Sequence, residues 1–300
     1  MKTNNVQYHK QLSNAFFDKN GKSSALPTII KTIEEQLKIK KTINFLDIGC
    51  NRGTLYSILK IIIYENKWED RINFYGIDYD KKSIELCSKR HNDVIFYNIN
   101  LNKINIKIKD HFDIITSINT LHEVFSGYIL KQSGKNDLSF KNAKTHTEAV
   151  LTELIKLLNK NSSFIIYDGL DVETFQYENI VRFSFVNAKD KDLFNIFVKE
   201  YEPIPINVKE INLNLFETSK SNLLRLISTF KYINTDIWDI ERKQTYHFFS
   251  ITDFKNTAYN NNLKIETIKS FSNDIELWKS KFILEDSDWP EKSVLIKYNN

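Results

Sequence analysis

The chain has 300 residues, of which 41% are hydrophobic and 13% aromatic, so it can bury a substantial core and is not a disordered protein. The net charge is +4, and the basic excess lies in residues 1–170, which fits either a phosphate-bearing partner or an ordinary solvated surface. The two cysteines stand outside any metal-ligand spacing, which predicts neither a metal site nor a disulfide framework. The start of the chain does not resemble a signal peptide, and no apolar run approaches about 20 residues. We therefore expect a cytoplasmic chain with no membrane partner.

Helices and short apolar strands alternate through the first part of the chain. The hydrophobic periodicity predicts helices over 5–17, 27–40, 54–66, 80–91 and 145–160. Short apolar runs predict strands over 43–49, 72–78, 93–99, 112–118 and 162–170. Such alternation is typical of a parallel sheet covered by helices on both faces and joined by right-handed crossovers.

The pattern changes after residue 170. Aromatic-rich, helix-like stretches fill 171–245, with a linker at 202–207, and predict a helical lid that decides the substrate. The α/β pattern returns with a helix starting near Thr252 and two strands, at 263–271 and 292–299, joined by a long loop. We therefore expect three parts: N-terminal helices over 1–40, a core made of 41–170 and 246–300, and the insertion.

Two of the chain's seven glycines lie four residues apart in FLDIGCNRGTL, residues 45–55, directly after an acid. Glycines between a strand and a helix allow a sharp turn and a close approach of the backbone to a ligand. The loop lacks the lysine of a triphosphate-binding loop and the middle glycine of a dinucleotide-binding loop, and Asp47 would repel a pyrophosphate. A cationic ligand is the option that remains.

This stretch resembles motif I of the class I S-adenosylmethionine-dependent methyltransferases, in the variant D-I-G-C-N-x-G. FYGIDYD at 74–80 is similar to motif II of that family, and FDIITSINTLHEVFS at 112–126 to motif IV and its helix. The resemblance implies S-adenosyl-L-methionine as cofactor. It also implies a Rossmann-like, doubly wound, seven-stranded sheet of the α/β class, closed by an antiparallel hairpin and carrying the helical insertion.

The same resemblance implies a set of cofactor-binding residues. Asp78 would hold the ribose hydroxyls and Tyr79 would lie against the adenine. Asn98 takes the place of the usual acid after the third strand, with Asn100 as the second match. NKNSS replaces the family's Pro-Gly-Gly turn before the fifth strand. The expected cofactor-binding residues are Asp47, Gly49, Cys50, Asn51, Gly53, Asp78, Tyr79, Asn98, Ile99 and Asn119.

Three residues on the rim after strands four and five are candidates for catalysis. His122 either acts as a general base or packs against the cofactor, Glu123 either anchors a substrate amine or caps its helix, and Asp168 either faces the cleft or caps a turn. Ser126 stands where a zinc helix would need its second histidine, so no metal is expected. Cys50 is expected to pack as a small side chain, and Asp113 to be structural.

The acceptor is left open by these residues. We expect methyl transfer to an oxygen or nitrogen atom of a small molecule or RNA. No N-P-P-Y or D-P-P-Y tetrad follows strand four, which argues against the adenine- and glutamine-N-methyltransferase type, and no catalytic Pro-Cys loop indicates methylation of a base carbon. Two alternatives share the fold: a non-catalytic methyltransferase-like binding subunit and an NAD-dependent oxidoreductase.

Overall fold

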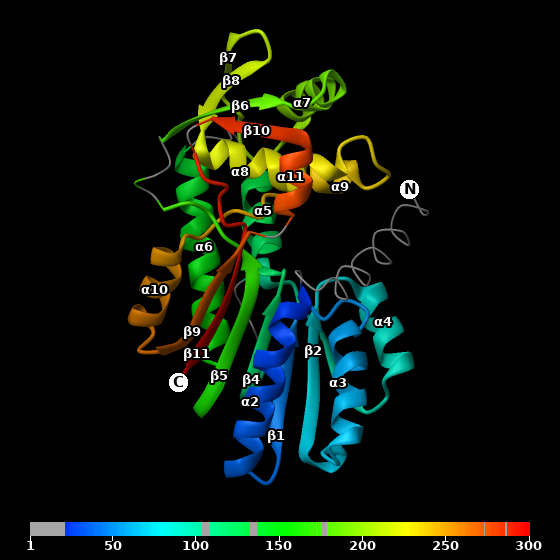
Figure 1. Ribbon diagram of the computed structural model, residues 1–300. Helices are drawn as coiled ribbons and strands as arrows, with labels where there is room; N and C mark the ends of the chain where they lie inside the picture. Colours follow the sequence, from blue (N-terminus) through cyan, green and yellow to red (C-terminus); the bar gives the residue numbers. More distant parts are fainter. Residues whose placement is uncertain are drawn as a thin grey trace.

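A twisted seven-stranded sheet is the centre of the computed structural model, which describes residues 22–103, 108–132, 137–173, 175, 179–272, 274–285 and 287–300. The expected helix at 5–17 lies outside these residues. The strand order is β3-β2-β1-β4-β5-β11-β9, in which β11 is antiparallel to both of its neighbours and the other pairs are parallel (Figure 1). The strands are β1 Ile43–Ile48, β2 Ile72–Asp78, β3 Val94–Asn98, β4 Phe112–Ile118, β5 Leu158–Gly169, β9 Lys264–Phe271 and β11 Ser293–Asn299.

Helices cover both faces of this sheet, as the alternating pattern predicts. One apolar cluster joins a face of the sheet to α2 and α3, and another joins the opposite face to α5, α6 and α10. The expected doubly wound fold with its closing hairpin is confirmed. The helices and short 3-10 turns are η1 Lys22–Ala25, α2 Leu26–Ile39, α3 Thr54–Glu65, η2 Glu69–Arg71, α4 Lys81–Arg90, η3 Leu101–Lys103, α5 Leu121–Lys131, α6 Asp137–Ile155 and α10 Ile251–Asn260.

The insertion is not purely helical, contrary to the expectation from its aromatic helical spacing. It contains helices, but also three strands of a second, antiparallel sheet with the order β10-β6-β8-β7. Its elements are β6 Ile180–Phe185, α7 Ala188–Glu200, β7 Val208–Asn212, β8 Leu215–Ser219, α8 Lys220–Thr229, η5 Phe230–Tyr232 and α9 Trp238–Glu241. The strands are five or six residues long, too short for their periodicity to stand out beside the helices.

The second sheet takes its fourth strand from elsewhere in the chain. The segment between β9 and β11, expected as a loop, forms α11 Ile275–Lys281 and β10 Phe282–Glu285, and β10 pairs with β6. A third apolar cluster fills this part of the molecule and includes Phe183, Phe197, Trp278 and Phe282. The small sheet lies beyond the end of the large sheet at which the parallel strands finish (Figure 1). No helix in the described part of the chain has the length and apolarity needed to cross a bilayer.

Candidate functional site

The loop after β1 has a left-handed backbone at both of its glycines. Gly49 has φ +72° and Gly53 has φ +73°, both in the left-handed region. A Cβ atom on Gly49 would lie 2.1 Å from Thr120 Oγ1, which is buried at the start of α5. The amides of Gly49 and Cys50 both donate to the carbonyl oxygen of Ile77, at 2.8 and 2.9 Å. The loop is therefore clamped between the ends of β2 and β4.

Asp78 holds the same loop from the end of β2. Its Oδ2 accepts the Asn51 amide and its Oδ1 accepts the Asp80 amide, each at 2.8 Å. Burial raises the pKa of this carboxyl group, and the backbone donors oppose that shift. Asp80 in turn caps α4 by accepting the amides of Lys82 and Ser83. Asp78 thus joins the loop after β1 to the loop after β2 through its own hydrogen bonds.

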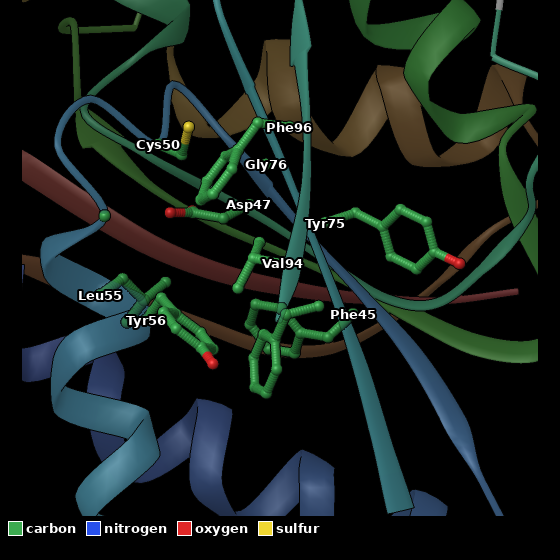
Figure 2. A pocket seen from close by; sticks show the side chains of 11 residues that line it. Phe45, Asp47, Cys50, Leu55, Tyr56, Tyr75, Gly76, Val94 and Phe96 are labelled. Carbon is green, nitrogen blue, oxygen red and sulfur yellow. The ribbon is translucent and has the colours of Figure 1, made fainter. Parts of the chain in front are cut away.

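Asp47 lies behind the loop rather than on the large cavity. Its side chain is buried, its Oδ1 accepts the Thr116 hydroxyl at 2.9 Å, and burial raises its pKa to about 7. It lines a pocket of about 10 Å³ together with Cys50, Gly53 and aromatic residues of β1, β2, β3 and α3 (Figure 2). Cys50 is buried and packs there as a small side chain.

A cavity of about 960 Å³ opens at the carboxyl ends of β1, β2, β3 and β4, between α5 and the segment around α9. Seven of the expected site residues line it: Gly49, Asn51, Asp78, Tyr79, Ile99, Asn119 and Glu123. Other lining residues were not expected from the sequence, and they are Lys22, Ile77, Asp80, Ser83, Leu101, Asn102, Ile118, Thr120, Val124, Ser126, Gly127, Leu130, Lys131, Asp239, Ile240, Arg242, Lys243 and Gln244. Most of these carry no motif, and the last five come from the insertion.

Asn98 ties two strand ends together instead of lining the cavity. Its amide nitrogen donates to the carbonyl oxygens of Asp78 and Tyr79, at 3.1 and 3.0 Å. The next residue, Ile99, does line the cavity, and so does Asn100, the second match to the third-strand motif. The side-chain oxygens of Asn51 and Asn102 are buried without a partner in the described structure, and both residues line the cavity. Their free acceptor atoms suit a ligand that donates hydrogen bonds, such as an amine or a hydroxyl group.

His122 and Asp168 form a buried pair away from the cavity lining. His122 Nδ1 lies 2.7 Å from Asp168 Oδ1, and both side chains are at most 3% exposed. Asp168 Oδ2 accepts the amides of Thr120, Leu121 and His122, and so holds the first turn of α5. Burial disfavours the charged imidazole, but the Asp168 carboxylate outweighs it and raises the pKa of His122. The other side of the ring packs on Tyr246, with ring centroids 4.6 Å apart.

Glu123 is the one of the three expected catalytic residues that lines the cavity. Burial raises its pKa to about 7, with a further contribution from Asp78, while His122 lowers it. A carboxyl group with such a pKa exchanges protons near neutral pH.

Asp113, expected to be structural, lies at the opposite end of the sheet. It accepts hydrogen bonds from Lys40 Nζ at 2.6 Å, the Asn44 amide at 2.7 Å and Asn159 Nδ2 at 2.8 Å. The expectation is confirmed.

The chain is similar to one known protein family and to several solved structures. A family model described as a methyltransferase domain matches residues 39–197. Among solved structures, an S-adenosylmethionine-dependent methyltransferase from Mesorhizobium loti has 11% identity and a TM-score of 0.45, covering 86% of this chain and 91% of that one. One from Methanosarcina mazei has 10% identity and a TM-score of 0.43, covering 87% and 93%. No curated protein sequence matches the chain.

Proposed function

The chain belongs to the family of methyltransferase domains, which use S-adenosylmethionine, and we propose that it transfers the methyl group to an oxygen or nitrogen atom of an acceptor bound beside Glu123. The observation that carries this proposal is the meeting of the glycine loop, Asp78 and Glu123 on one cavity. The sulfonium of the cofactor supplies an activated methyl group, and the S–C bond breaks to leave a neutral thioether.

We propose that the cofactor binds at the end of the cavity formed by the glycine loop and Asp78. The backbone of Gly49 and Asn51 would hold the amino acid part of the cofactor. Asp78 would accept hydrogen bonds from the ribose hydroxyls, and Tyr79 would lie against the adenine. The Asp78 carboxylate keeps its bonds to the loop amides, so one side chain both shapes the loop and meets the ligand. Asp47, at the other side of the loop, adds negative charge that suits a cationic ligand.

The acceptor's proton passes to the Glu123 carboxylate in this proposal. A base matters most for a hydroxyl, which loses its proton as the new bond to carbon forms, and for a protonated amine, which must lose a proton before its nitrogen can attack. We give His122 and Asp168 a positioning role: their buried pair and the three capped amides fix the first turn of α5, on which Glu123 stands. Asn98 likewise positions the ends of β2 and β3.

Calorimetry with S-adenosylmethionine, S-adenosylhomocysteine and NAD tests the cofactor, and labelled methyl transfer to metabolite and RNA pools then tests the reaction. We expect both sulfur ligands to bind and NAD not to bind. Binding of NAD alone would overturn the proposal in favour of an oxidoreductase. Cofactor binding with no transfer to any pool would favour the non-catalytic binding subunit.

A further inference from the structure

The large cavity has room for more than its cofactor. Ligand pockets in proteins span roughly 300–1,000 Å³. At about 960 Å³ this cavity stands at the upper end of that range. Its lining also reaches well past the glycine loop, along α5 as far as Lys131 and across to residues 239–244 of the insertion. A second molecule therefore fits beside the cofactor.

The charged residues of the cavity wall come from two sets of elements. Asp78, Asp80 and Glu123 follow β2 and β4 at the proposed cofactor end, and Lys22 lies near them. Burial lowers the pKa of Lys22, and the nearby Glu123 carboxylate opposes that shift. Lys131 at the end of α5, together with Arg242, Lys243 and Asp239 of the insertion, makes up a second set of charged lining residues, here called the basic end. The acidic end suits the cationic cofactor, and the basic end calls for a negative ligand.

Two of the three cations at the basic end have no partner in the described structure. Arg242 already has partners, because its guanidinium forms ion pairs with Glu202 and Asp239. Lys131 and Lys243 make no ion pair or side-chain hydrogen bond with any described residue. Their elements are joined where the Thr245 amide donates to Ser126 Oγ at 2.9 Å. The two free ammonium groups thus come from neighbouring walls of one cavity.

Helix α5 connects this basic end to the proposed base. Glu123, Gly127 and Lys131 are spaced four residues apart, so they lie on one face of the helix, and all three line the cavity. The Cα atoms of the first and last are about 12 Å apart at 1.5 Å per residue. The two side chains are therefore close enough to contact one molecule of metabolite size. Gly127 between them has no side chain, and the Asn102 side-chain amide lies 3.1 Å from the position of a Cβ atom there.

We propose that the methyl acceptor is a small molecule bearing a carboxylate or phosphate group, which Lys131 and Lys243 bind while the atom to be methylated lies at Glu123. This assignment rests on the proposed methyl transfer at the same cavity. The two lysines determine which acceptors bind, and they take no part in binding the cofactor.

Calorimetric titration of the protein loaded with S-adenosylhomocysteine tests the assignment, at constant ionic strength, with inorganic phosphate and succinate as separate probes and neutral glycerol as a blank. We expect saturable binding of at least one anion, weakened tenfold or more in the Lys131→Met/Lys243→Met double variant. Lys255→Met removes an exposed charge from α10 outside the cavity lining, and it should behave as the unmodified protein. The anion that binds distinguishes a carboxylate from a phosphate.

Equal anion binding by the double variant and the unmodified protein, or no saturable binding of either anion, would overturn the assignment. Lysine-dependent binding of a single-stranded RNA probe without anion saturation would do the same and assign the wall to nucleic acid. Failure of S-adenosylhomocysteine to bind would count against the proposed function instead. Titration of the ligand-free protein with the two anions would still test whether Lys131 and Lys243 bind an anion.

Discussion

Replacing Asp78 with alanine should weaken cofactor binding and loosen the glycine loop together. The carboxylate accepts the amides of Asn51 and Asp80, both at 2.8 Å. A hydrogen bond to a charged group contributes about 1.5–3 kcal/mol. Asp78 is only half-buried, so water can replace part of what is lost, and we expect the free energy of unfolding to fall by about 2–3 kcal/mol. Loss of the proposed ribose contacts should weaken cofactor binding by roughly 10- to 150-fold.

Asp113→Ala is the matched control. Like Asp78, this aspartate accepts hydrogen bonds at the end of a strand of the large sheet, but it lies at the opposite end of the sheet. It should destabilise the protein by a comparable or larger amount, since it accepts three hydrogen bonds and its side chain is 7% exposed. Its affinity for S-adenosylhomocysteine should not change. Urea denaturation gives the stability of each variant and calorimetry the affinity. If Asp78→Ala binds S-adenosylhomocysteine as tightly as Asp113→Ala does, the reasoning about Asp78 is wrong.

Three further outcomes follow from the site. Gly49→Ala should lower the free energy of unfolding by about 2–4 kcal/mol, because it combines a positive φ with overlap on the start of α5. Gly127→Ala has a helical backbone and a 3.1 Å contact with the Asn102 side chain, so thermal denaturation should show a smaller loss of stability than for Gly49→Ala. Glu123→Gln should reduce labelled methyl transfer by about 10²- to 10⁴-fold and abolish a rise in rate with pH near 7; a retained rise would show that another group is the base. Burial raises the pKa of both Asp47 and Glu123 to about 7, so these groups are partly neutral there and a cationic ligand favours their charged forms. S-adenosylmethionine should therefore bind more tightly as pH rises through 7 and release protons, which calorimetry in buffers of different ionisation enthalpy measures; proton uptake on binding would contradict this.

The expected role of the insertion in deciding the substrate cannot be tested by deleting residues 171–245 alone. Strand β10, at Phe282–Glu285, pairs with β6 inside that range, and Trp278 and Phe282 belong to its apolar cluster. A shortened chain that kept these elements would expose a strand edge and two large aromatic side chains. A clean deletion has to replace residues 274–285 as well, leaving β9 and β11 joined by a short turn.

The sequence by itself determined the large sheet, its covering helices and the position of the glycine loop. Those features depend on local patterns: apolar runs set the strands, helical periodicity sets the buried faces, and two glycines after an acid mark the turn. Only the tertiary structure decided which polar side chains share a cavity. His122 and Glu123 are neighbours in sequence, yet one is buried against Asp168 and the other lines the cavity, because successive helical residues point about 100° apart. Lys243 and the pairing of β10 with β6 left no local signal, since each depends on contacts between segments far apart in the chain.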